Sequence, residues 1–345
     1  MRKVESKPWR TFFFGVAGTA GGLIAVLFGF VAIVDPLNIL PLSPRLDRGL
    51  ATSNQRFSYA ALARSPRFDS AIFGRSTAQL LRPEVLDATL HGRFVNLSIL
   101  AATAYEQTRI MRVFVETHPE TRWIVVGLDG EWCRTGNTIP KLTFRPFPEW
   151  MYERDTWHGY REALNLSMIE LAGKQFALLT GLKKEEFSRE GYQPFVPPDD
   201  RYDPARAAAR LREQGPEEPS GTRDGPAASW RFPTFAWLSD VLAAKPPRAR
   251  VILFFVPYHR SLQPPDDSVG GAAWTACKRH AVAFARQQNG VFVVDFMRPS
   301  PITRDDEAYW DPHHYRIGIA DRIVQDLAAA AVGEPSMDYE ILSPP

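Results

Sequence analysis

The sequence contains very few cysteines. Only Cys133 and Cys277 occur among 345 residues, which excludes a small fold held together by several disulfides. Outside the cytoplasm the two thiols could pair, and otherwise they would be two buried free cysteines. The sequence alone leaves both interpretations open.

An excess of charge is also absent. The chain holds 41 basic and 39 acidic residues, and the first ten residues carry four of the basic ones against one acid. The remainder therefore has 37 basic and 38 acidic side chains, so nothing predicts nucleic-acid binding. No His, Cys, Asp and Glu spacing is typical of a metal site. The glycines of residues 18–22 lie in an apolar run and suit helix packing better than phosphate binding. We expect no metal and no cofactor.

Residues 11–34 contain no charged side chain at all. As a helix these 24 residues would extend about 36 Å, enough to cross a hydrocarbon core of roughly 30 Å with some tilt. The basic residues before them predict that the N-terminus stays in the cytoplasm. A cleaved signal peptide would have a shorter apolar region and a small-residue cleavage site, which is not found before Asp35. We therefore expect a retained single-pass anchor; a buried helix of a soluble protein is a weaker interpretation, because no charge interrupts the run.

Composition divides the rest of the chain. Residues 35–66 are rich in Pro, Arg and Ser and read as a stalk. The expected parts are a cytoplasmic tail (1–10), the anchor (11–34), the stalk (35–66), a domain (67–335) with an insertion at about 131–232, and a tail (336–345). Helices are expected at 159–181 and 204–213. The polar composition of residues 213–228 favours a surface excursion, and the insertion is expected to be partly disordered or to form a lid.

Five short apolar runs predict the strands of one sheet. They are residues 70–73, 94–99, 123–128, 251–256 and 291–296. Several are almost continuously apolar and β-branched, as strands buried on both faces are. Helical patterns separate them, at residues 104–117, 235–244, 272–288 and 318–331. Strands that alternate with helices predict an α/β fold with a mainly parallel five-stranded sheet covered on both faces.

Ser76 lies where the first predicted strand ends and a helix begins. Ligands of open α/β sheets bind beyond the carboxyl ends of the strands. At a helix N-terminus, free backbone N–H groups and the helix dipole favour developing negative charge, so the Ser76 N–H could donate to an oxyanion. On its own, however, a serine at this position is an ordinary helix cap.

Asp311 and His314 supply the partners that a nucleophilic serine needs. They lie in Tyr309-Trp-Asp-Pro-His-His-Tyr315, after the last predicted strand. A general base must reach the nucleophile, and a carboxylate must fix the imidazole tautomer. Pro312 restricts Asp311 to an extended conformation, which suits a loop. Without a nucleophile nearby, Asp311 and His314 could simply be polar residues at the start of the last helix.

Together these blocks resemble the SGNH, or GDSL-like, hydrolase superfamily. The resemblance rests on residues 69–76 (DSAIFGRS), 94–98 (FVNLS), 126–129 (VGLD) and 311–315 (DPHHY) and covers the predicted strands, roughly half of the chain. It is greatest to membrane-anchored extracytoplasmic members, among them proteins of cell-envelope polymer acylation. The resemblance implies a flavodoxin-like three-layer α/β/α sandwich, an inner-membrane anchor and a periplasmic domain.

Site roles follow from the same resemblance. It implies Ser76 as nucleophile, His314 as general base and Asp311 as its orienting partner, with His313 as the alternative base. The family's second block carries a glycine whose N–H faces the oxyanion, where this chain has Ala101 and Ala102. The third block usually carries an asparagine, where this chain has Asp129; an ionised carboxylate donates no hydrogen bond.

Two further polar residues lie at the ends of predicted strands, Asn96 at the end of the second and His259 after the fourth. Asn96 and His259 lie close to the expected substrate position, although stabilisation of a loop would explain either. The expected function is a serine esterase or O-acyltransferase acting on an acylated or acyl-accepting envelope or secreted glycan, in partnership with membrane acyl-transfer machinery. The alternative is a non-catalytic periplasmic scaffold or a glycan-binding pseudoenzyme.

Overall fold

The computed structural model describes residues 7–44 and 46–345, and the chain divides into two compact units. The first comprises residues up to 54 and residues 149–186; the second comprises residues 55–148 and 187–345. The segment expected as a stalk is therefore not one piece. Its last part, from residue 55, begins the second unit, where Gln55–Leu62 forms helix α2. The expected insertion is likewise shared between the units.

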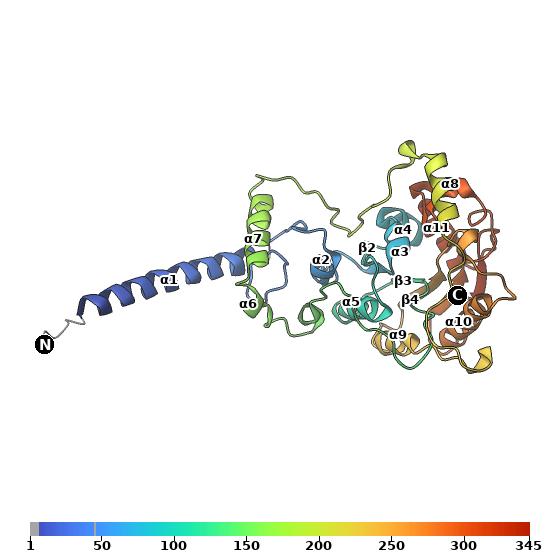
Figure 1. The fold of residues 1–345 in the computed structure, drawn as a ribbon, viewed down its shortest axis with the longest axis horizontal. Helices are drawn as coiled ribbons and strands as arrows, with labels where there is room; N and C mark the ends of the chain where they lie inside the picture. Colours follow the sequence, from blue (N-terminus) through green and yellow to red (C-terminus); the bar gives the residue numbers. More distant parts are fainter. Residues whose placement is uncertain (1–6, 45) are drawn as a thin grey trace. The chain divides into compact units, whose positions relative to one another are not determined.

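The first unit is helical. Helix α1 spans Lys7–Val34 (Figure 1), and its residues Pro8–Val34 are long and apolar enough to cross a membrane. The unit also contains a short 3₁₀ turn (Glu149–Tyr152), α6 (Gly159–Glu162) and α7 (Leu166–Leu179). The single helix expected at 159–181 is thus two helices. Asn165 separates them because its side chain accepts the Met168 N–H and caps α7.

The second unit is built on a six-stranded sheet in the order β2-β1-β3-β4-β5-β8. The first five strands in that order run parallel, and β8 joins the edge antiparallel to β5. The strands are β1 (Ser70–Phe73), β2 (Phe94–Asn96), β3 (Trp123–Leu128), β4 (Arg250–Phe255), β5 (Val291–Asp295) and β8 (Glu340–Ser343). The fold is therefore mixed α/β, as predicted. All five predicted strands are present, with ends that differ by no more than three residues.

Strand β8 corrects two expectations. The sheet has six strands rather than five, and residues 340–343 of the expected tail (336–345) belong to the sheet. This strand was missed because only Ser343 is buried among its four residues, so it lacks the continuous apolar run of a central strand. By contrast, every residue of β1, β3 and β5 is buried.

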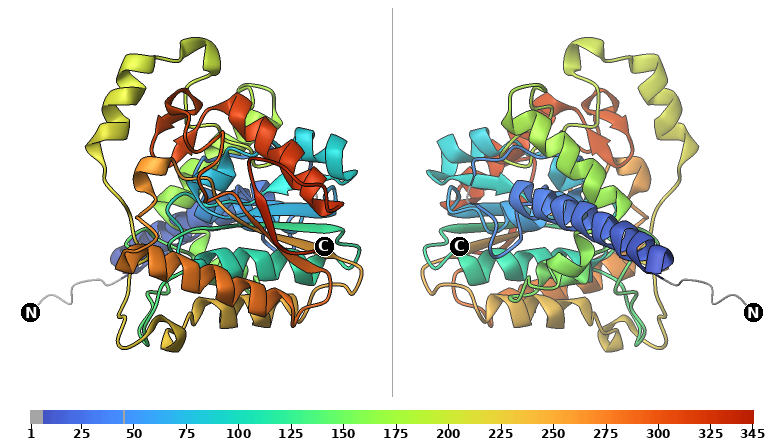
Figure 2. Two further views of the ribbon diagram at one scale, coloured as in Figure 1. Left: turned by 90° about the vertical axis from the view of Figure 1, so that its right-hand side faces the viewer. Right: turned by 90° about the vertical axis from the view of Figure 1, so that its left-hand side faces the viewer.

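Helices lie on both sides of this sheet. Figure 2 shows α5, α9 and α10 on one side and α4 and α11 on the other; α5 packs against α9 and α4 against α11. Their bounds are α3 (Ser76–Gln79), α4 (Pro83–Leu90), α5 (Ala104–Thr117), α8 (Pro204–Glu213), α9 (Thr234–Leu242), α10 (Val269–Ala285) and α11 (Ile317–Ala331). Thr103 and Glu106 form a reciprocal capping box that starts α5 where the sequence predicts it.

A small hairpin precedes α11. It consists of β6 (Tyr309–Asp311) and β7 (His314–Tyr315), which pair antiparallel. Asp311 is extended ahead of Pro312, as expected. Short 3₁₀ turns complete the unit, at Asp199–Arg201, Ala227–Ser229, Arg260–Leu262 and Asp306–Ala308.

The polar segment 213–228 is fixed more firmly than its composition indicates. Thr135 donates its N–H to the Ser220 carbonyl and pairs with Gly221 in an isolated β-bridge. Glu217 donates its N–H to the Leu262 carbonyl. The segment is exposed over much of its length, but backbone hydrogen bonds hold it against the sheet's loops.

Candidate active site

Ser76 is presented by a sharp turn between β1 and α3. Gly74 makes that turn with φ +155°, a conformation that favours glycine. A Cβ atom at this position would lie 2.6 Å from the Cβ of Ala78, so glycine is also needed for space. Ser76 is the first residue of α3. Its own N–H has no acceptor in the described part of the chain, as expected at a helix start.

The hairpin of β6 and β7 carries the other two side chains. Asp311 Oδ1 accepts the backbone N–H groups of His313 and His314, at 2.9 and 3.1 Å, which fixes the turn between the strands. The Tyr315 hydroxyl donates to the Thr77 carbonyl at 2.6 Å. This last bond ties β7 directly to α3, so the histidine-bearing hairpin is held against the serine-bearing helix.

Ser76, His314 and Asp311 form a continuous hydrogen-bonded chain. Ser76 Oγ lies 2.8 Å from His314 Nε2, and His314 Nδ1 lies 2.8 and 2.9 Å from the two carboxylate oxygens of Asp311. Because a carboxylate only accepts hydrogen bonds, Nδ1 carries the proton and Nε2 is free to accept from the serine hydroxyl. This is the arrangement in which an imidazole can take a proton from an attacking serine.

Asp311 is kept in its charged form. Burial raises its pKa, but the hydrogen bond with His314 and the backbone N–H of His313 outweigh burial and lower the pKa below its usual value. An ionised Asp311 stabilises the imidazolium that forms when His314 accepts a proton.

His313, the alternative base, points elsewhere. Its Nε2 lies 2.6 Å from the carboxylate of Glu217, and its ring stands edge-on to Tyr258 with centroids 4.9 Å apart. The bond to His313 lowers the pKa of Glu217, against the effect of burial. Of the two neighbouring histidines, the structure brings His314 to Ser76.

Two residues of the insertion reach this site, and sequence reasoning missed both. The ring of Phe195 stands edge-on to His314, with centroids 5.0 Å apart, and Glu217 contacts His313. Neither belongs to a recognisable motif, because both lie in loops whose composition is polar or rich in proline. These contacts place two loops of the expected insertion against the hairpin that carries His313 and His314.

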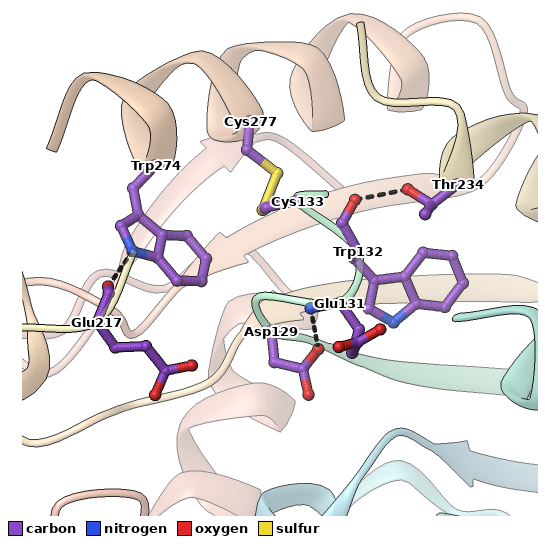
Figure 3. The surroundings of a disulfide bond; sticks show 8 residues. All are labelled: Asp129, Glu131, Trp132, Cys133, Glu217, Thr234, Trp274 and Cys277. Carbon is purple, nitrogen blue, oxygen red and sulfur yellow. Dashed lines mark hydrogen bonds between the residues drawn. A yellow bond between two sulfur atoms is a disulfide. The ribbon is translucent and has the colours of Figure 1, made fainter. Parts of the chain in front are cut away.

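A disulfide stabilises the surroundings of Glu217. Cys133 and Cys277 pair and are fully buried, which decides between the two interpretations of these residues. Trp274, one turn before Cys277 on α10, donates its Nε1–H to the Glu217 carbonyl at 3.1 Å (Figure 3). In Figure 3 the carboxylates of Glu217 and Asp129 lie on the same side of the disulfide.

The two alanines of the second block differ in whether their backbone N–H is bonded. Ala102 donates its N–H to the Ile99 carbonyl at 3.1 Å, so it is not available to a ligand. Ala101 instead has φ +51°, and its N–H has no acceptor among the described residues. The Ile99 N–H bonds to the Gly74 carbonyl at 3.0 Å, so this loop runs beside the turn that presents Ser76.

Asp129 follows β3, next to the serine-bearing strand, and is almost completely buried. Its Oδ1 accepts the Glu131 N–H at 2.9 Å, and its Oδ2 lies 3.5 Å from Arg75 Nη1. Burial raises the pKa of Asp129 to about 6, although the Arg75 charge opposes the rise. The Nε of Arg75 is buried and has no hydrogen-bond acceptor in the described structure.

Replacing Asp129 with asparagine is expected to stabilise the fold at neutral pH. The pKa of Asp129 is higher in the folded protein than in the unfolded chain. Its ionisation therefore leaves the free energy of unfolding unchanged below pH 4 and lowers it progressively as the pH rises to about 6 and beyond. The difference between the two pKa values corresponds to roughly 3 kcal/mol of stability at pH 7. Urea unfolding of wild type and Asp129→Asn at pH 4, 5, 6 and 7 should give curves that converge at acid pH. Equal stability at pH 7 would show that Asp129 ionises normally.

The two remaining candidates, Asn96 and His259, make hydrogen bonds to neighbouring loops. The Asn96 amide donates to the carbonyls of Ala78 and Leu81 at 3.0 and 2.9 Å and so closes the C-terminal end of α3. His259 Nε2 lies 3.1 Å from Asp306 and its Nδ1 lies 2.9 Å from Ser261. Burial lowers the pKa of His259. Neither residue contacts the serine, histidine and aspartate chain, and both hold loops around it.

Across residues 7–44 and 46–345, no group of His, Cys, Asp and Glu could hold a metal ion. Compared with known proteins, the chain matches no protein-family model and no curated protein.

Proposed function

We propose that this protein is a serine esterase or O-acyltransferase of the SGNH type that acts on a cell-envelope or secreted glycan. The supporting observation is the unbroken chain from Ser76 Oγ through His314 to Asp311. A serine that only caps a helix needs no imidazole within hydrogen-bond distance, and a histidine that only fills a loop needs no oriented carboxylate.

The chemical step follows from these contacts. Ser76 Oγ attacks the carbonyl carbon of an acyl ester while its proton passes to His314 Nε2, and the carbonyl oxygen becomes an oxyanion. The N–H groups of Ser76 and Ala101 would donate to that oxygen. The intermediate collapses as the bond from the carbonyl carbon to the leaving oxygen breaks, and His314 gives its proton to that oxygen, which leaves an acyl-serine and a free alcohol. Water or a sugar hydroxyl then attacks the acyl-serine while His314 takes its proton; the bond to Ser76 Oγ breaks, and His314 returns the proton to Ser76. The identity of this second nucleophile decides between hydrolysis and transfer.

The same proposal covers fold and location. The parallel sheet with helices on both sides supports a flavodoxin-like three-layer α/β/α sandwich. Helix α1, with basic residues before it, supports a single-pass anchor in the inner membrane with the N-terminus in the cytoplasm. The Cys133–Cys277 disulfide supports a periplasmic location for the second unit, since disulfides persist in oxidising compartments. A partner in membrane acyl transfer is compatible with this location.

A serine-reactive probe tests the proposal. The full chain in detergent should be labelled covalently by a fluorophosphonate, and labelling should disappear in Ser76→Ala. Ser239 is a half-exposed serine on α9, far along the chain from Ser76. The control variant Ser239→Ala should be labelled as strongly as wild type. Labelling that survives in Ser76→Ala would place the nucleophile elsewhere.

A non-catalytic glycan-binding protein is the second candidate. It is favoured by Asp129, a carboxylate where an oxyanion site needs a donor. A folded wild-type protein that neither labels nor hydrolyses aryl esters, yet binds glycan, would support this alternative.

A further inference from the structure

The free part of helix α1 has the length of a bilayer's hydrocarbon core. Side chains of residues 8–26 are exposed, and packing against the rest of the first unit begins at residue 27. These 19 free residues correspond to about 28 Å of helix, close to the roughly 30 Å of a hydrocarbon core; the one charged residue among them, Arg10, lies at the N-terminal end, where its side chain can reach the membrane surface. If α1 crosses a membrane, whatever packs on residues 27–34 must lie at the membrane surface.

Helices α6 and α7 occupy that level. Phe176 of α7 contacts Phe30 of α1 with ring centroids 5.8 Å apart, and Tyr160 of α6 contacts Phe28 at 6.1 Å. Figure 1 shows α7 running across the end of α1 instead of along it. A helix that lies crosswise to a spanning helix runs along the plane of the membrane.

Helix α7 has three distinct faces. One face is buried in the unit and consists of Met168, Ala172 and Gln175. Beside it runs an apolar stripe at i, i+3, i+7 and i+10: Leu166, Ile169, Gly173 and Phe176. Leu166 is 82% exposed and Phe176 is 44% exposed. The third face is polar, with Ser167 and an exposed ion pair between Glu170 and Lys174. The buried face explains how α7 packs against the rest of the unit. It does not explain why a second, exposed face is also apolar.

The flanks of α7 carry the residue types that membrane surfaces favour. Trp157, 54% exposed, packs against Tyr160, and aromatic residues of this kind concentrate at membrane–water interfaces. Directly after α7, Leu182 is 79% exposed and is followed by exposed Lys183 and Lys184. Basic side chains next to exposed apolar ones suit lipid phosphates above acyl chains.

We infer that α7 lies in the surface of the membrane that α1 crosses, with its apolar stripe facing the acyl chains. The inference rests on the proposed membrane anchor and is independent of the proposed chemistry. The partner is the bilayer itself, because the stripe is continuous with the point where α1 leaves its free, membrane-length segment. The first unit would then hold the chain by one spanning and one surface-lying helix.

Spin labels at neighbouring positions test this placement. The variants Leu166→Cys and Gly173→Cys carry a label on the stripe, and a Cβ at Gly173 meets no atom within 4 Å. Their immediate neighbours Ser167→Cys and Lys174→Cys carry it on the polar face, about 100° around the helix. A label at Gly18, where a Cβ also has open space, reports on α1. The full chain is reconstituted in nanodiscs of zwitterionic and anionic lipid, with the buried disulfide left oxidised.

The expected result is a clear alternation in collision rates. Labels at 166 and 173 should collide several-fold more with oxygen, which concentrates in lipid, and less with a water-soluble nickel chelate, than labels at 167 and 174. Equal exposure of all four to the nickel chelate, with position 18 in lipid, would overturn the surface helix and leave the anchor standing. Exposure of position 18 itself to the chelate would overturn both. Neither result depends on whether Ser76 reacts with a probe.

Discussion

Replacement of His314 by glutamine should lower kcat/KM for an aryl acetate by about 10⁴- to 10⁶-fold. Glutamine can still donate a hydrogen bond to Asp311, but no titrating nitrogen would remain 2.8 Å from Ser76 Oγ to take its proton. Asp311→Asn should cost about 10⁴-fold, because an amide can hold the wrong imidazole tautomer. Initial-rate kinetics on purified full-length variants measure both losses.

The neighbouring histidine provides the matched control. His313→Gln removes an equivalent side chain from the same hairpin, but His313 bonds to Glu217 and not to the serine. We expect His313→Gln to change kcat/KM only a few-fold, mainly through KM, since Glu217 borders the site. If His313→Gln were as inactive as His314→Gln, the base would be shared or the hairpin would rearrange during the reaction.

The features that could be predicted from the sequence share one physical cause. Strands β1, β3 and β5 are buried on both faces, so their residues form short, nearly continuous apolar runs. Because parallel strands place their carboxyl ends at one edge of the sheet, Ser76 could be assigned to that edge. Asp311 and His314 follow the last parallel strand, and the structure brings them to the same edge.

The features that escaped prediction depend on contacts without a local pattern. Glu217 sits in a polar segment whose composition indicated only an excursion, yet its carbonyl is held by Trp274. Which of Ala101 and Ala102 has a bonded N–H depends on one backbone hydrogen bond from Ala102 to Ile99, which no residue type encodes. Alanine, unlike glycine, is not a sequence signal for a positive φ, so the conformation of Ala101 could not be predicted.

Loss of the Cys133–Cys277 disulfide should be the largest change in stability. The bond closes a loop across a sequence separation of 144 residues, for which the loop-entropy relation gives about 5 kcal/mol. For a unit of this size, that corresponds to a decrease in Tm of roughly 10–20 °C. The double variant Cys133→Ala/Cys277→Ala, compared with oxidised wild type by thermal unfolding in the same detergent, measures the decrease.

Chemical reduction separates the covalent bond from the packing around it. Both cysteines are fully buried, so a phosphine reductant added to the folded protein should leave Tm unchanged. Reduction in denaturant followed by refolding should reproduce the Tm of the double variant.

The disulfide joins the loop after β3 to α10, whose Trp274 holds Glu217 beside His313. The double variant and the protein refolded after reduction should therefore also show a raised KM. Their kcat should be less affected, since the hydrogen-bonded chain of Ser76, His314 and Asp311 lies on other elements. An unchanged Tm in the double variant would mean that packing alone holds this side of the site.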